Sequence, residues 1–275
     1  MAHNTSGDWS LFLVQFTPMV KTLVRCFGIG LVAMIPTFSN TIDYSLAGQW
    51  SNTANPNGPW TYREGNEALP LVTDYNFGGT VPGFTPQPAW APSNVGGQFL
   101  PVWLQSSQTG TPSGFEAGAV TPGDVIVHST DGFNGSGEGI ANVIWTSPSA
   151  GTIDISGDIW WVRNLGRTND FSVFVGGTLI ADGAISDGST NTRSNPLQFA
   201  SGLLLGDSFS DIPVSAGEIV ELAVTRGSGA GEISDLNFQI DETTPSAVPE
   251  PAGLVLLLGL GLAGAVALRN QMKRV

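Results

Sequence analysis

Two kinds of side chain in this sequence are suited to acid–base chemistry. A Ser-His-Asp mechanism would need His128 beside a serine and an acid, but no nucleophile-elbow motif is present, so we interpret His128 as a strand-end or surface residue. Two carboxylates flanking a glycosidic bond can hydrolyse a polysaccharide. Asp154 with Asp158, and Glu64 with Glu67, are the pairs that the spacing offers. Nothing distinguishes them from the other acids, so a secreted polysaccharide hydrolase using paired carboxylates is the alternative interpretation.

A glycine-rich loop offers the oxygen ligands that a hard cation prefers. Asp131, Asn134 and Glu138 lie within eight residues and carry carboxylate or amide oxygens, which makes calcium the candidate metal here. The spacing differs from that of an EF-hand, and a plain glycine-rich loop is the alternative. Zinc would need three or four histidine or cysteine ligands, and residues 40–245 hold one histidine and no cysteine. We expect no other cofactor.

Tryptophan is the side chain best suited to binding a sugar, because its flat ring can stack on the C–H face of a pyranose. The candidates are Trp60 and the adjacent pair Trp160 and Trp161. Neighbouring residues of a strand point to opposite faces, so we expect one of this pair in the core and the other facing outward. Burial in the core is the alternative for each.

Short strands must position these residues, since no stretch of residues 40–245 has a sustained helical period. Turn residues separate runs rich in β-branched and aromatic side chains, as in a sandwich or jelly roll. Gly176-Gly177 between two such runs is a hairpin signal. The sequence predicts nine strands, within residues 124–128, 140–146, 152–162, 171–175, 178–181, 197–205, 208–214, 219–225 and 236–240.

The organisation that we predict is an all-β chain with one ectodomain, residues 40–245. Residues 122–242 supply the sandwich strands. Residues 40–121 are rich in Trp, Pro, Gly and Asn, and we expect them to form a loop-rich layer with a few edge strands that closes over the sandwich. No cysteine falls in the ectodomain, so its stability must come from packing alone.

Both ends of the chain carry export features. Residues 1–39 predict a signal peptide, because Lys21 and Arg25 precede a ten-residue apolar stretch that ends at Ile35 and is followed by Pro36. Met19 is an alternative start, in which case residues 1–18 are an extension. Residues 246–275 contain an apolar run of 17 residues, 252–268. At about 1.5 Å per residue it reaches roughly 26 Å as a helix, enough for one transmembrane span.

A short motif and a basic tail flank this apolar run. Pro249, Glu250 and Pro251 precede it, and Arg269, Lys273 and Arg274 follow it and should stay on the cytoplasmic side. The order resembles the PEP-CTERM sorting signal of exported bacterial proteins. The resemblance implies an exosortase-type processing protease as partner, transient anchoring in the inner membrane, and a final place at the cell surface or in an extracellular matrix.

A second resemblance concerns the fold. The segment Trp-Thr-Ser-Pro-Ser-Ala-Gly-Thr-Ile at 145–153 and the later Ser-Ala-Gly-Glu-Ile-Val at 215–220 are similar to strand pairs of jelly-roll β-sandwich domains found in exported proteins and carbohydrate-binding modules. The resemblance implies a jelly-roll-like β-sandwich and, less directly, polysaccharide as a partner.

The negative charge of the ectodomain limits the classes of molecule that it can bind. Residues 40–245 hold five arginines, no lysine and 21 acidic residues, a formal charge of −16. Such a surface lacks the basic footprint that nucleic acid requires, and it repels anionic polysaccharides unless calcium bridges them. The sequence therefore predicts a non-enzymatic, structural or adhesive exported protein that binds neutral polysaccharide.

Overall fold

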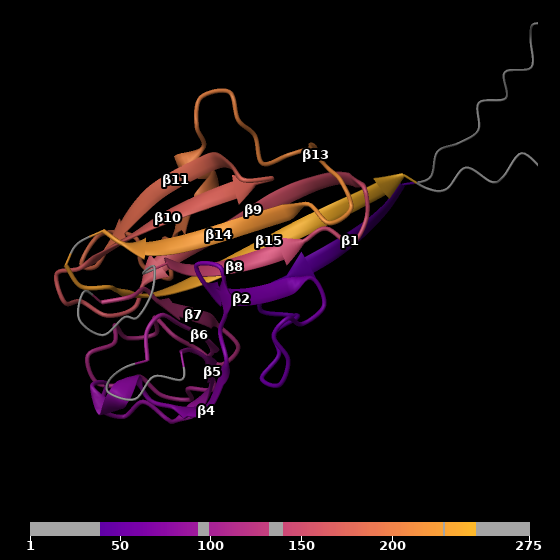
Figure 1. The fold of residues 1–275 in the computed structure, drawn as a ribbon. Coiled ribbons are helices and arrows are strands. Elements are labelled where there is room, and N and C mark those ends of the chain that lie inside the picture. Colours follow the sequence, from indigo (N-terminus) through magenta and orange to yellow (C-terminus); the bar gives the residue numbers. More distant parts are fainter. Residues whose placement is uncertain (1–38, 93–98, 132–139, 228, 246–275) are drawn as a thin grey trace, which may run out of the picture. The chain divides into compact units, whose positions relative to one another are not determined.

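The computed structural model describes residues 39–92, 99–131, 140–227 and 229–245 (Figure 1). Ser39–Pro245 form one compact unit. Two antiparallel sheets make up this unit, and its helical elements within the described residues are two short 3-10 turns, η1 (Phe77–Gly79) and η2 (Phe199–Gly202). The predicted all-β, sandwich-like fold is confirmed.

The larger sheet is organised around its longest strand, β15. One side of β15 pairs with β9, and the other side pairs with β7 near its start and with β1 near its end. The order of the sheet is β12-β9-β15-β7-β6-β5-β4, with β1 beside β15 and β13 beside β9. Its strands are β1 (Ser39–Ser45), β4 (Leu71–Tyr75), β5 (Gln87–Trp90), β6 (Val102–Gln105), β7 (Val125–His128), β9 (Gly151–Trp161), β12 (Leu197–Gln198), β13 (Ile212–Val214) and β15 (Ile233–Pro245).

The smaller sheet has the order β11-β10-β14-β8-β2-β3. Alternating residues of its strands, such as Tyr62, Val143 and Leu222, point into the core, as the period of two requires. Its strands are β2 (Trp60–Glu64), β3 (Glu67–Ala68), β8 (Ile140–Thr146), β10 (Thr168–Val175), β11 (Thr178–Ser186) and β14 (Ile219–Arg226).

Two hydrophobic clusters stabilise the unit, on opposite faces of the larger sheet. The main cluster fills the space between the sheets and includes Trp103 and Val127. The second cluster includes their neighbours Leu104 and Ile126, with Phe77, Val81, Phe84 and Phe115 from the connections around β4–β7. The larger sheet is therefore buried on both faces where β5, β6 and β7 lie.

Glycine is required at two places in this framework. Gly157 interrupts β9 with φ of 148°, and a Cβ there would lie 2.2 Å from the Asn237 carbonyl oxygen. Gly176 and Gly177 have φ of 55° and 79° and form the tight turn between β10 and β11. Both are left-handed or otherwise disfavoured conformations that glycine adopts without steric cost.

Most of the nine predicted strands are confirmed. The run at 140–146 is β8, and the runs at 219–225 and 152–162 match β14 and β9 within a residue or so. The strand expected at 197–205 is wrong, because only Leu197–Gln198 are extended and η2 follows at once. The first part of the ectodomain also supplies strands to both sheets, among them β2, which lies between β8 and β3.

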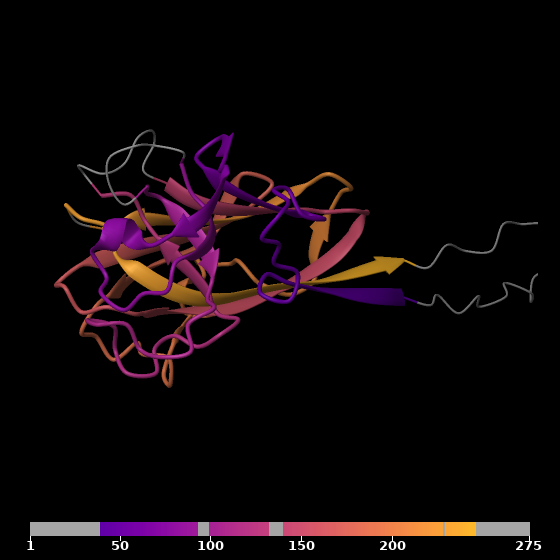
Figure 2. The ribbon, with the colours of Figure 1, turned by 90° about the horizontal axis from the view of Figure 1, so that it is seen from below.

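The two ends of the described unit lie together. β1 pairs with the end of β15 so that Ser39 is opposite Pro245, and Figures 1 and 2 show the two strand ends side by side. Within the described residues no helix is both long and apolar enough to cross a membrane. The signal segment as far as Phe38 and the apolar run 252–268 lie outside those residues, so both stay predictions.

Candidate functional site

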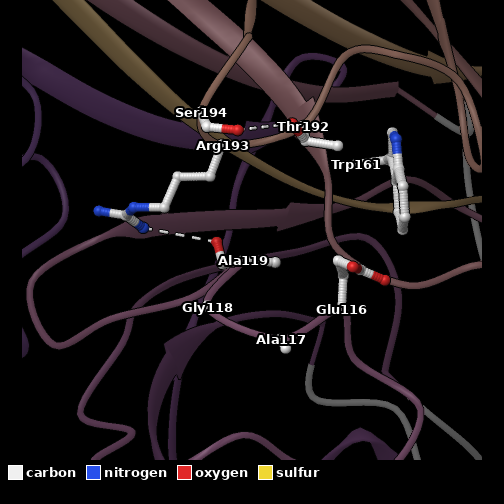
Figure 3. Close-up of a pocket in the computed structure, with 8 residues that line it drawn as sticks. All are labelled: Glu116, Ala117, Gly118, Ala119, Trp161, Thr192, Arg193 and Ser194. Carbon is white, nitrogen blue, oxygen red and sulfur yellow. Dashed lines mark hydrogen bonds between the residues drawn. The ribbon is translucent and has the colours of Figure 1, made fainter.

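A pocket of about 450 Å³ opens where β9 ends. We call it the end pocket. Trp161, the last residue of β9, forms part of its wall, and two loops complete it: residues 116–119 between β6 and β7, and residues 192–194 between β11 and β12. Figure 3 shows the Trp161 indole and the Arg193 guanidinium on opposite sides of the pocket, with the exposed Glu116 below the indole.

An ion pair holds the second loop in place. The guanidinium of Arg193 donates from Nη2 to Asp124 Oδ1 at 2.9 Å and from Nη1 to Asp124 Oδ2. Its carbon lies 5.2 Å from the centre of the Trp160 ring, a cation–π contact. The hydrogen bonds to Asp124 raise the pKa of Arg193 above its usual value. Arg193 is therefore a fixed cation that is already bound to an acid.

A second carboxyl lies beneath this ion pair. Asp235 is fully buried on β15, opposite Ile126 of β7 and Trp160 of β9. Burial, and next the charge of Asp124, raises the pKa of Asp235 well above its usual range. Asp124 itself accepts from the Thr121 backbone N–H at 2.5 Å.

The structure corrects the expected orientation of the tryptophans. Trp160 and Trp161 do point to opposite faces, but both are buried, 2% and 5% exposed, and neither faces outward as expected. The Trp160 N–H donates to the Ala119 carbonyl at 2.8 Å and the Trp161 N–H to the Ser189 carbonyl at 3.1 Å. Loops that the sequence could not place cover both rings. Of the pair, Trp161 lines the end pocket.

Trp60 is a core residue. Its ring is fully buried, packs 6.0 Å from Phe238 and donates its N–H to Gln49 Oε1 at 2.9 Å. Stacking on a sugar would need the Trp60 ring to face solvent. The buried ring does not, so the structure gives no support to Trp60 as a sugar-binding residue.

A buried polar cluster surrounds the end of β7. His128 contacts the Ser129 carbonyl oxygen through Nδ1 at 2.7 Å, and burial lowers its pKa to about 4, so the ring is neutral near pH 7. Asp131 accepts from the Gly231 N–H at 2.7 Å and lies 3.7 Å from the Arg167 guanidinium. Glu232, also buried, accepts from the Ile233 N–H at 2.8 Å. These contacts join the ends of β7, β10 and β15.

The calcium candidate is only partly described. Asp131 is buried and bonded as above, whereas Asn134 and Glu138 lie outside the described residues. In the part of the chain that the structure describes, no group of three histidine, cysteine or acidic side chains has an arrangement suited to a metal ion. The calcium site stays a prediction.

The two carboxylate pairs predicted from spacing lie outside the end pocket. Asp158 accepts from the side-chain amides of Gln198 and Asn237 at 3.0 and 2.8 Å, and Asp154 accepts from the Asp211 N–H at 2.7 Å. Glu64 and Glu67 lie opposite each other in the β2–β3 hairpin. None of the four lines the end pocket.

Sequence reasoning missed Glu116 and Arg193, which line the end pocket from two loops, and Asp235, which is buried on β15 near the Arg193–Asp124 ion pair. One signal was available for Arg193, since an arginine in a lysine-free acidic domain has many acids to pair with. Nothing in the local sequence of Glu116 marks it as a pocket residue. The burial of Asp235 depends on the pairing of β15 with β7 and β9.

Comparison with known proteins identifies the C-terminal segment. Residues 247–274 match the PEP-CTERM protein-sorting motif, a span that contains Pro249, Glu250 and Pro251 and the basic residues Arg269, Lys273 and Arg274. The motif implies an exported protein that is anchored transiently in the membrane and processed by exosortase. The predicted sorting signal is confirmed.

Solved structures give only a distant likeness. Two structures of the catalytic domain of a GH87 alpha-1,3-glucanase in complex with nigerose, one with an Asp-to-Ala substitution, are 13% identical in sequence and have TM-scores of 0.24 and 0.23. The match covers 71% of this chain and 30% of theirs, so this chain spans less than a third of their length. No curated protein matches the chain.

Proposed function

We propose that this exported protein becomes, after processing, a structural or adhesive component of the cell surface or extracellular matrix, and that its sandwich binds neutral polysaccharide at the end pocket without cleaving it. The jelly-roll-like, carbohydrate-binding-module-like character expected from the sequence is part of this proposal. The observation that carries it is the position of the pocket relative to the sorting motif along β15.

The sorting motif and the end pocket lie toward opposite ends of strand β15. Its last residue, Pro245, is followed two residues later by the sorting motif at 247–274. The end pocket lies at its other end, where Ser234 is opposite Trp161. Eleven residues of strand separate these points, about 36 Å at 3.3 Å per residue. The ligand site is therefore at the end of the sandwich remote from the residue that leads to the anchor.

The chemistry of the end pocket supports an uncharged polyhydroxyl ligand. Glu116 and the hydroxyls of Thr192 and Ser194 offer exposed acceptors and donors beside Trp161, whereas the charge of Arg193 is bound by Asp124. An anionic chain would meet an ectodomain of formal charge −16 and would need calcium as a bridge.

The lining of the pocket favours binding over hydrolysis. Glycoside hydrolysis requires two carboxyls that both reach the substrate, and Glu116 is the one acidic residue that lines the end pocket. A hydrolase stays the second candidate because Asp235, a carboxyl whose pKa is raised by burial, lies near the Asp124–Arg193 ion pair at the end pocket. Against it, Asp235 is completely buried.

Two experiments test this proposal. Replacing Pro249, Glu250 and Pro251 by alanine should leave full-length protein in the membrane fraction, whereas the parent should lose mass at its C-terminus. The same mass and fractionation for both would overturn sorting and leave a permanent anchor.

The binding half is tested by retention of the full chain on insoluble neutral polysaccharides, with and without a calcium chelator. Glu116→Ala should reduce retention, and Glu67→Ala, an exposed acid of β3, is the matched control. Release of reducing sugar that Asp235→Asn abolishes would instead favour the hydrolase.

A further inference from the structure

The connection between β11 and β12 forms one wall of the end pocket. It consists of residues 187–196, and we call it the strap. It leads from β11, at the edge of the smaller sheet, to β12, which pairs with β9 in the larger sheet. Figure 3 shows Thr192, Arg193 and Ser194 along one side of the pocket and residues 116–119 along the other. Any movement of the strap would therefore change the shape of the pocket.

Packing in the core does not hold the strap. Its sequence is Asp-Gly-Ser-Thr-Asn-Thr-Arg-Ser-Asn-Pro, without a large apolar side chain. Each of its residues is half-buried or exposed, and none is buried. Segments with few buried apolar contacts open locally at a smaller free energy than core strands do. Polar contacts must therefore keep the strap in place.

The first residue of the strap is firmly attached, whereas its middle is not. The Asp187 carboxylate accepts from two backbone N–H groups in the connection between β9 and β10. Farther along, Trp161 donates its backbone N–H to the Asn191 carbonyl at 3.4 Å and its indole N–H to the Ser189 carbonyl at 3.1 Å. Both bonds from Trp161 join uncharged groups, and such bonds contribute little net stability.

The ion pair of Arg193 with Asp124 is the strongest contact of the strap beyond its first residue. The guanidinium donates to both carboxylate oxygens, and such charge-assisted pairs are roughly twice as strong as neutral hydrogen bonds. Its Nη1 also donates to the Ala119 carbonyl at 3.4 Å, so the pair joins the strap to the opposite wall of the pocket. The side chain of Arg193 is 35% exposed and that of Asp124 12%, so water can compete for the pair.

Trp161 needs the strap to move before its ring can stack on a sugar. It lines the end pocket but is only 5% exposed, whereas stacking requires an accessible ring face. The bond from its indole N–H to the Ser189 carbonyl places the strap directly beside the ring. Movement of the strap would break this bond and expose the indole.

We propose that residues 188–196 move away from the end pocket when the ion pair of Arg193 with Asp124 breaks, and that this movement exposes Trp161 to a neutral polysaccharide. The inference rests on the proposed function and adds a regulated opening to the same site. A site that must open before it binds has an apparent affinity reduced by the fraction of molecules that are open. Breaking the pair should therefore tighten binding, whereas a pair that only shapes the pocket would weaken binding when it is lost.

Limited trypsin digestion of the full chain tests the movement. Trypsin cleaves after arginine, so it reports access to the peptide bond that follows Arg193. Asp124→Asn keeps an oxygen for the Thr121 N–H but loses the charge, and cleavage after Arg193 should become at least tenfold faster than in the parent. Asp182→Asn, an exposed acid of β11, is the matched control and should be cleaved as the parent is. Cleavage after Arg63, inside β2, should stay slow and reports global unfolding.

Calorimetric titration of the same proteins tests the link to binding. The probes are neutral hexasaccharides of glucose, mannose and galactose. Asp124→Asn should bind the preferred probe at least threefold more tightly than the parent, and Trp161→Leu should bind it at least tenfold more weakly. Arg193→Gln removes the charge from the other side of the pair. It is the second variant if Asp124→Asn fails to fold, with hydrogen exchange of residues 187–196 as the measure of opening.

The outcomes separate the strap from the proposed function. Faster cleavage after Arg193 alone, together with tighter binding, supports the inference. Unchanged cleavage in Asp124→Asn and unchanged exchange in Arg193→Gln overturn it and leave the proposed function standing. Faster cleavage with unchanged or weaker binding also overturns it, as does cleavage after Arg63 at the same rate as after Arg193. If neither the parent nor the variants bind any hexasaccharide, the proposed function fails, and the role of the strap in binding fails with it.

Discussion

Replacing Glu232 with glutamine should stabilise the protein, and increasingly so as the pH rises. Burial raises the pKa of the Glu232 carboxyl from 4.5 to about 9, and the nearby Asp187 carboxylate adds to the rise. Asp187 is fixed in place, since it accepts from the Arg167 backbone N–H at 2.9 Å. The protonated Glu232 is therefore the form that fits the fold.

The size of the effect follows from the two pKa values. A group whose pKa is raised by folding stabilises the native state fully below its unfolded pKa, and that stability is lost as the pH rises through the folded pKa. Between pH 4.5 and 9 the loss is about 1.36 kcal/mol per pH unit, or roughly 3 kcal/mol at pH 7. Glutamine has the shape of the protonated acid and needs no proton. Glu232→Gln should therefore be more stable by up to about 3 kcal/mol at pH 7, or about 6–12 °C in melting temperature.

Thermal and denaturant unfolding of parent and variant at pH 5, 6.5 and 8 measures this effect. The difference in free energy of unfolding should grow by about 1.4 kcal/mol per pH unit. Subtracting the parent at each pH removes the contribution of His128, whose lowered pKa acts in the opposite direction below pH 6.5. Glu67→Gln on exposed β3 controls for loss of a surface charge. A stability difference that is the same at all three pH values would refute the argument that Glu232 is protonated in the fold.

Three further predictions concern the framework. Gly157→Ala should destabilise the fold strongly or abolish it, because the new Cβ would lie 2.2 Å from the Asn237 carbonyl oxygen. Gly110→Ala, with open space around it, is the control and should melt within a few degrees of the parent. Equal melting temperatures for the two variants would contradict the close approach at Gly157. Trp60→Ala should lower the free energy of unfolding by about 3–5 kcal/mol in denaturant unfolding, as for a large aromatic side chain removed from a core. Retention on polysaccharide should be unchanged at temperatures where the variant is folded. A stable variant that loses retention would instead make Trp60 a binding residue. Dithiothreitol should not shift the melting temperature, since Cys26 is the one cysteine in the sequence, and a shift would point to an intermolecular disulfide.

The sequence predicted the strands well where side-chain alternation was regular. The strand predicted at 171–175 lies in β10, where half-buried and buried residues alternate from Thr168 to Val175. At 197–205 the apolar run misled, because Phe199 enters the core from a 3-10 turn rather than from a strand. A composition count cannot separate these two cases, since both place apolar side chains inside.

The candidate sites were less predictable because they depend on long-range pairing. Trp160 and Trp161 were recognised as a pair on opposite faces, but the loops that bury them are set by contacts to Ala119 and Ser189, some 40 and 30 residues away. Asn142 looks like an ordinary strand residue in sequence. Its burial, and its hydrogen bonds to Glu221 and to the Gly65 carbonyl, arise only because β2 and β14 lie on either side of β8.

Strand β15 connects the larger sheet, the end pocket and the sorting motif. It pairs with β9, β7 and β1, so the larger sheet is incomplete until this strand, the last of the ectodomain, has joined it. The same strand places Asp235 beneath the ion pair at the end pocket and leads directly into the sorting motif. The contacts of β1 with β15 join residues about 200 positions apart, and such non-local pairings form slowly because the loop entropy must be lost first. Since the sorting motif begins two residues after Pro245, the strand that completes the larger sheet is also the strand that directly precedes the motif in the chain.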